Sequence, residues 1–92
     1  MIRSIRHKGL RRLYERNDPR GVIFEHAEKL RDILARLDAA ETVADMNLPG
    51  FRLHALKGGR RGNWAITVRA NWRVVFRFEA GSIVDVDLID YH

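Results

Sequence analysis

The sequence predicts an α+β fold in which two N-terminal helices pack on a mostly antiparallel sheet. Apolar residues recur at helical spacing in the first half of the chain, whereas the second half holds short alternating or continuous apolar segments bounded by turn residues. Helices that precede a group of strands, rather than alternating with them, are typical of this class. The chain has 92 residues, 46% of them hydrophobic, so we expect one domain, residues 1–92, with a single core.

The first half is expected to hold one short strand and two helices. Residues 2–6 alternate apolar and basic side chains, which indicates a strand. Residues 8–16 have apolar positions at helical spacing, and the Asn-Asp-Pro sequence at 17–19 should end this helix. A short helical turn is expected at 43–46. The second helix has a single apolar stripe, made of Ile23, Ala27, Leu30, Leu34 and Leu37.

Four strands are expected in the second half, at 51–55, 64–68, 72–78 and 83–89. Opposed residues of an antiparallel pair point to the same face, so the apolar sets match only across three-residue loops. We therefore expect loops at 69–71, with left-handed backbone at Asn71, and at 80–82. This register pairs Val68 with Trp72, Ile66 with Val74, Val74 with Leu88, Phe76 with Val86 and Phe78 with Val84.

The other face of this sheet carries charged side chains. Arg77 is expected opposite Asp85 as an ordinary cross-strand ion pair, whereas Arg73 is opposite Ile89 and has no carboxylate across the strand. Arg69 lies in the adjacent loop, at the end of the sheet where the last strand leads to residues 90–92. Two interpretations stay open for this face: a solvated surface whose charges neutralise one another, or a site at the end that holds the unneutralised arginines.

The last three residues, Asp90, Tyr91 and His92, combine acidic, stacking and proton-transfer chemistry. An imidazole with a pKa near neutrality gives and takes protons, so His92 is a candidate catalytic residue. The alternative is an idle histidine in a solvated tail. His54 either faces a cleft or forms a hydrogen bond at the sheet edge. We expect His7 and His26 at the surface, and Trp64 and Trp72 in the core.

The basic loop at 57–62 follows a strand and is a candidate phosphate-binding loop. It is not a P-loop, because it lacks the Gly-Lys-Ser/Thr sequence and the helix that follows it. The alternative is a flexible hairpin connection. The net charge is +5, from 17 Lys+Arg against 12 Asp+Glu, and arginine dominates, which favours nucleic acid as a partner. A genome that encodes arginine readily is the alternative explanation.

Several function classes are excluded or disfavoured by composition. The chain has no cysteine, which excludes disulfides, thiolate nucleophiles and cysteine-based zinc sites. The four histidines have no spacing typical of a metal site, and no carboxylate cluster supplies one, so no metal or other cofactor is expected. No apolar run reaches membrane length and no signal peptide is apparent, so we expect a cytoplasmic protein without a membrane partner.

Segments throughout the chain resemble the HigB toxins of the RelE superfamily: Leu-His-Ala-Leu-Lys-Gly at 53–58, Gly-Asn-Trp-Ala-Ile-Thr-Val at 62–68, Asn-Trp-Arg-Val-Val-Phe-Arg-Phe at 71–78, Asp-Val-Asp at 85–87, Asp-Tyr-His at 90–92, and the stretches 1–10 and 46–52. The resemblance implies the compact fold of small microbial ribonucleases. It also implies a ribosome-dependent endoribonuclease that cuts mRNA in the decoding site. Ala65 replaces the family's usual serine, and the loop at 59–61 is more basic than usual.

The same resemblance implies partners and site residues. The partners would be a HigA-like helix-turn-helix antitoxin, the ribosome with its mRNA, and operator DNA only through the toxin–antitoxin complex. A non-catalytic ribosome- or RNA-binding module is the alternative, and a DNA-binding regulator lacks a helix-turn-helix in this chain. The catalytic set would be His54, Lys57, Arg73, Asp90, Tyr91 and His92, with Arg60, Arg61 and Arg69 as RNA-binding residues.

Each of these residues has an expected task in metal-independent attack by the ribose 2′-OH. Arg73 and Lys57 would hold the phosphate, and Tyr91 would stack on or position a nucleotide. His92 would transfer a proton, as acid rather than base, with Asp90 orienting it. His54 is the candidate for the second proton-transfer partner, whose identity stays open.

Overall fold

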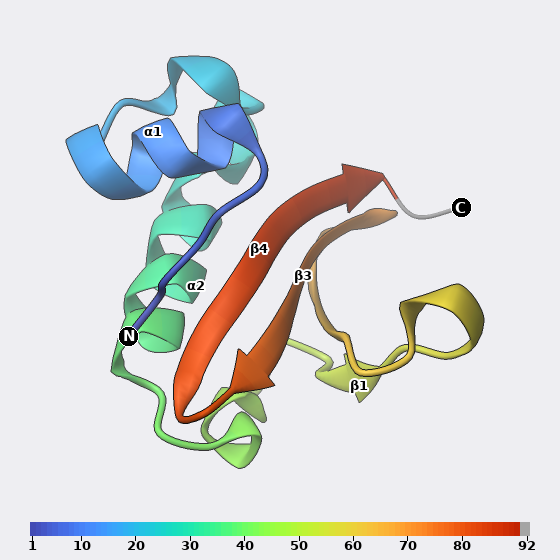
Figure 1. Ribbon diagram of the computed structural model, residues 1–92. Helices are drawn as coiled ribbons and strands as arrows, with labels where there is room; N and C mark the ends of the chain where they lie inside the picture. Colours follow the sequence, from blue (N-terminus) through green and yellow to red (C-terminus); the bar gives the residue numbers. More distant parts are fainter. Residues whose placement is uncertain (91–92) are drawn as a thin grey trace.

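The computed structural model describes residues 1–90 and confirms the α+β fold, with helices on one face of a four-stranded antiparallel sheet (Figure 1). The helices are α1 (Lys8–Arg16) and α2 (Ala27–Ala39), and the strands are β1 (His54–Ala55), β2 (Trp64–Arg69), β3 (Trp72–Glu79) and β4 (Ser82–Asp90), in the order β1-β2-β3-β4. Four short 3₁₀ turns complete the described chain: η1 (Pro19–Gly21), η2 (Phe24–His26), η3 (Val43–Met46) and η4 (Gly58–Arg60).

The N-terminal segment pairs with the edge strand β4, beside which it runs in Figure 1. The strand expected at 2–6 is reduced to two parallel bridges, at Ile2 and Ile5, which face Ile83 and Val86. The amides of Arg3 and Arg6 donate 2.7 Å hydrogen bonds to the same two partners. In return, the amides of Ile83 and Val86 donate to the carbonyl oxygens of Met1 (3.0 Å) and Ser4 (3.1 Å).

Local capping sets the ends of α1, which spans the residues expected from the sequence. The His7 side chain caps the helix because its Nδ1 accepts a 3.0 Å hydrogen bond from the amide of Leu10. Asn17 ends the helix with left-handed backbone at φ 52°. His7 is therefore half-buried and structural, so its expected place at the surface is wrong.

The second helix starts later than the apolar stripe suggests. It begins at Ala27, because the 3₁₀ turn η2 precedes it, and Ile23 is left 43% exposed outside it. The same turn buries His26, whose side chain is 7% exposed and whose expected place at the surface is therefore also wrong. Its spacing of four residues from Leu30 is the pattern that would have placed it on the buried stripe.

Both hairpins turn more tightly than expected. Arg69 pairs with Trp72 and Glu79 with Ser82, so each turn has two residues rather than three, and the left-handed backbone lies at Ala70 (φ 51°) instead of Asn71. Each hairpin also has a register shift, one between Thr67 and Arg69 and one between Val75 and Arg77. Two-residue turns match the strand twist, and a bulge then restores the inward and outward alternation.

Because of these bulges, the expected strand pairing is confirmed only in part. The pairs of Val74 with Ile66 and with Leu88 are confirmed. The pairs of Val68 with Trp72 and of Phe78 with Val84 are wrong, because Trp72 faces Arg69 and Phe78 faces Ile83. The expected pair of Phe76 with Val86 falls within the second bulge, where Asp85 has a positive φ of 55°.

The main core lies between the helices and the sheet. Its fully buried members include Leu10, Leu30, Ile33, Leu37, Met46, Ile66, Val74, Phe76, Ile83 and Val86. Trp64 and Trp72 are half-buried and pack against this core, which confirms their expected side of the sheet. On the opposite face a second, smaller cluster joins Leu56, Ala65 and Val75, with Ile89 packed on it. Within residues 1–90, no helix is long and apolar enough to cross a membrane.

Candidate active site

Arg73 is the best-defined member of the candidate site. Its neighbours across the sheet are Thr67 on β2 and Ile89 on β4, as the sequence predicts. Its Nη1 donates hydrogen bonds to the carbonyl oxygens of Ala70 (2.6 Å) and Trp72 (3.2 Å), so the tight turn before β3 holds the guanidinium. Within residues 1–90 no carboxylate pairs with Arg73, and its buried Nε has no hydrogen-bond partner.

Arg77, four residues further along β3, differs from Arg73 because carboxylates neutralise its charge. Its guanidinium contacts Asp85 at 2.8 Å and Glu79 at 3.2 Å, and its hydrogen bond to Asp85 raises its pKa. The Asp87 carboxylate accepts a 2.9 Å hydrogen bond from the amide of Leu88. The expected mutual neutralisation therefore holds for Arg77 and Asp85, and it does not extend to Arg73.

Strand pairing brings Arg69, Arg73 and Asp90 to one end of the sheet. Trp72, the first residue of β3, pairs with Arg69 on one side and Asp90 on the other. Directly opposed Cα atoms in an antiparallel pair are about 4.5–5.5 Å apart. Arg69 is the last residue of β2 rather than a loop residue, because the turn is shorter than expected. Arg69 and Asp90 are both exposed at the end that carries Arg73.

The smaller apolar cluster forms the floor of this face. It joins Leu56, Ala65, Val75 and Ile89, which come from the segment after β1 and from all three long strands. Lys57 follows Leu56, Arg73 lies two residues before Val75 on the same face, and Asp90 follows Ile89, so each of these candidate residues is close in the chain to a member of the cluster. The cluster itself gathers residues that are up to 33 positions apart, from Leu56 to Ile89, into one apolar patch.

His54 and the basic loop lie toward the other edge of the sheet. His54 is exposed in β1, and its Nδ1 is 2.9 Å from the carbonyl oxygen of Arg52, so the alternative of a hydrogen bond at the sheet edge is the observed one. A carbonyl only accepts, so in the neutral tautomer that forms this hydrogen bond the proton is on Nδ1 and the lone pair is on Nε2. Arg60 and Arg61 are exposed at η4, which projects beyond the sheet in Figure 1.

The remaining site predictions concern the last two residues and metal binding. Tyr91 and His92 lie outside the described residues. Among residues 1–90, no three histidine, aspartate or glutamate side chains are grouped so that they would hold a metal ion.

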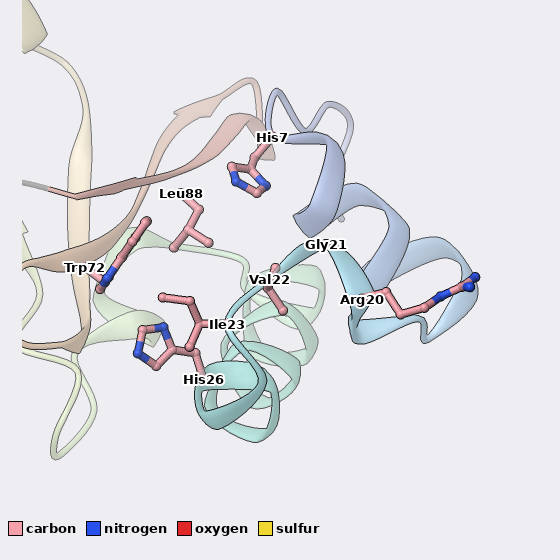
Figure 2. Close-up of a pocket in the computed structure, with 8 residues that line it drawn as sticks. All are labelled: His7, Arg20, Gly21, Val22, Ile23, His26, Trp72 and Leu88. Carbon is pink, nitrogen blue, oxygen red and sulfur yellow. The ribbon is translucent and has the colours of Figure 1, made fainter.

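A cavity that the sequence gave no reason to expect lies on the helix side of the same sheet end. It has a volume of about 310 Å³, and His26 and Trp72 form part of its wall (Figure 2). Their rings meet edge to face, with centroids 6.0 Å apart and planes at 65°. Trp72 was expected as core only, so its role in a cavity beside Arg69 and Asp90 is a finding of the structure.

Comparison with known proteins gives two results. A family model described as the RelE-like toxin of the type II toxin–antitoxin system HigB matches residues 3–92. A curated relative, the Endoribonuclease HigB of Proteus vulgaris, is 41% identical over 92 residues, which is the full length of both chains.

Proposed function

Because the chain belongs to the family of HigB-like toxins, we propose that it is an endoribonuclease that cuts translated mRNA and so inhibits translation. The family implies an antitoxin partner. The observation that supports an RNA-cleaving site is Arg73, an oriented guanidinium with no carboxylate partner within residues 1–90. A cation in this state remains available for a phosphate, and a planar fork suits phosphate geometry.

The chemistry proposed is attack of the ribose 2′-OH on the adjacent phosphate, which releases the 5′-oxygen of the next nucleotide. Arg73 and Lys57 bind the phosphate and stabilise the charge that develops on it. His54 takes the 2′-OH proton, in agreement with the lone pair on its Nε2. His92 protonates the leaving oxygen, and Asp90 orients it.

The remaining residues bind the RNA. Tyr91 stacks on a nucleotide, Arg69 contacts the mRNA beside the cleaved phosphate, and Arg60 with Arg61 contacts ribosomal RNA. Such a sparse site needs its substrate held in place, so we propose that the ribosome positions the mRNA and that free RNA is a poor substrate. The protein would then act in the cytoplasm, as one domain over residues 1–92.

The partners follow from the same proposal. A HigA-like helix-turn-helix antitoxin would bind this chain, and the operator DNA would be contacted only through the complex. The competing function is a ribosome- or RNA-binding module without catalysis, which needs the basic residues but not His92.

The two arginines of β3 provide the test. Arg73→Ala should lower cleavage of ribosome-bound mRNA about 10²–10³-fold, the usual loss when one charge-stabilising donor is removed. Arg77→Ala is the matched control on the same strand and face, and it should stay within a few-fold of the parent because Asp85 and Glu79 already neutralise this cation.

The outcomes separate the candidate functions. Induction without the antitoxin should stop translation, with cut sites inside reading frames. Arrested translation with intact mRNA would support the binding module instead. An equal loss in both arginine variants would show that the face acts only through its overall positive charge.

A further inference from the structure

The cavity at the end of the sheet has walls suited to a flat ring. Val22, Ile23 and Leu88 supply aliphatic surface, and Trp72 and His26 supply aromatic surface (Figure 2). Its volume of about 310 Å³ is at the small end of the range for ligand sites. Arg20 also lines the cavity, but its side chain points away from these groups in Figure 2 and pairs with Asp18 at 2.9 Å.

Two histidines give this apolar cavity a polar character. His26 is 7% exposed, and its buried Nδ1 has no hydrogen-bond partner in the described chain. A buried polar group without a partner is costly, and His26 lies on the cavity wall, so the cavity favours a ligand with a polar edge over a purely apolar one. His7 also lines the cavity, and because its Nδ1 accepts from Leu10, its neutral ring carries the proton on Nε2. In Figure 2 Leu88 lies between the two imidazoles.

The cavity also adjoins the candidate active site. Trp72 pairs directly with Arg69 and Asp90, and the next residue is Arg73. The Trp72 side chain faces the helices while Arg73 faces the apolar floor, so the cavity and the phosphate-binding residues share the end of one strand. Arg69, whose backbone pairs with that of Trp72, therefore places a cation at the sheet end that holds the cavity.

We propose that this cavity binds a nucleobase of the RNA, with the base stacked on Trp72 and its polar edge hydrogen-bonded to His26 and His7. This inference rests on the proposed endoribonuclease function and adds a specificity site to it. Single-stranded RNA is commonly read by splayed bases that stack on aromatic side chains and are hydrogen-bonded along their edges. An apolar side chain of a protein partner would fill the volume but would leave the imidazole of His26 unpaired.

NMR titration of the full chain with nucleoside 5′-monophosphates measures binding independently of catalysis. Ligand concentrations up to about 10 mM allow a millimolar dissociation constant to be detected. The indole N–H signal of Trp72 and the ring signals of His26 should shift. The indole signal of Trp64, the other half-buried tryptophan, is the internal control and should not move. Ribose 5-phosphate, which has no base, should leave the Trp72 signal unchanged.

His26→Phe keeps an aromatic ring and removes both nitrogens. It should weaken nucleotide binding and flatten the base preference of cleavage on ribosome-bound mRNA, lowering cuts at preferred sites about 5- to 50-fold relative to other sites. Phe24→Ala, at a neighbouring side chain that is 79% exposed, is the control and should keep the parental pattern. Melting temperatures of all variants show whether each is folded.

Each outcome bears on one proposal. The base site would be overturned by a Trp72 shift with ribose 5-phosphate, by no shift with any nucleotide, or by a folded His26→Phe variant that keeps both the parental cleavage pattern and the parental ribosome affinity. Reduced ribosome affinity in His26→Phe, with the cut pattern unchanged, would mean that the base comes from ribosomal RNA rather than from the substrate. Nucleotide binding by a chain that never cuts RNA would refute the endoribonuclease and leave the base site standing.

Discussion

The contact between Gly9 and Gly21 gives a sharp test of how this fold positions its functional end. Gly9 lies in the first turn of α1, and Gly21 ends η1 and lines the cavity. A Cβ built on Gly9 would overlap the carbonyl oxygen of Gly21 and would lie 2.9 Å from its Cα, both of which are backbone atoms. Backbone cannot rotate away as a side chain does, so Gly9→Ala must push η1 off the helix.

The expected magnitude follows from two opposing effects. Overpacking of a tight site typically costs about 1–3 kcal/mol, and more where backbone must move. Alanine favours a helix over glycine by at most about 1 kcal/mol. Because the contact here is with backbone, the upper part of the overpacking range applies, about 2–3 kcal/mol. The net loss is therefore about 1–3 kcal/mol, which for a domain of this size lowers the melting temperature by roughly 5–20 °C. Helix propensity alone predicts the opposite sign.

Thermal unfolding of the parent, Gly9→Ala and Gly59→Ala decides between these signs. Gly59 is the control, because nothing lies within 4 Å of its added Cβ, and its variant should stay within about 0.5 kcal/mol of the parent. A folded Gly9→Ala should also bind nucleotides more weakly, since displaced η1 residues line the cavity. A melting temperature at or above the parental value would refute the close packing of α1 on η1.

Three further predictions concern pH, ribosome binding and catalysis. Hydrogen bonds from the Ile2 amide and then the Tyr14 hydroxyl hold the pKa of Asp38 below its usual value, so its stabilising effect is present above about pH 4 and is lost as pH falls through the lowered pKa. Urea midpoints of Asp38→Asn and the parent should therefore differ at neutral pH and converge in acid. Replacing Arg60 and Arg61 with alanine should weaken ribosome binding and its salt dependence, and identical binding across a salt series would contradict a phosphate contact. Deleting His92 should keep the parental unfolding curve but reduce mRNA cleavage about 10²–10⁴-fold, and cleavage at the parental rate would exclude its proton-transfer role.

Elements with strong local signals were predictable from the sequence. The apolar spacing and the Asn-Asp-Pro break defined α1 to the residue, and the helical turn at Val43–Met46 was also confirmed. The assignment of Ile66, Val74 and Phe76 to the core face was correct because alternation fixes which side chains share a face. These features depend on residues close together in the chain.

The errors arose where several local solutions satisfy the same pattern. A three-residue loop and a two-residue turn combined with a bulge restore the match between apolar faces equally well. Only the backbone conformation of the turn distinguishes the two solutions. The burial of His26 depends on a 3₁₀ turn that offsets the start of α2, and periodicity alone did not reveal that turn. The cavity depends on packing between η1, η2 and the ends of β3 and β4, which are distant in sequence.

The observed turn has a consequence for the site that the expected loop would not have had. Because Ala70 takes the left-handed conformation, its carbonyl oxygen lies where the guanidinium of Arg73 donates to it at 2.6 Å. The same two-residue turn moves Arg69 from a loop into β2, directly opposite Trp72. One turn therefore places Arg69 and holds the Arg73 guanidinium, which within residues 1–90 is held by backbone carbonyls and not by a carboxylate. A cation that stabilises a transition state acts best when its position is fixed before the substrate binds. No free energy is then spent on orienting it during the reaction, which lowers the activation barrier. Backbone carbonyls supply that orientation at Arg73, as the proposed phosphate-binding role requires.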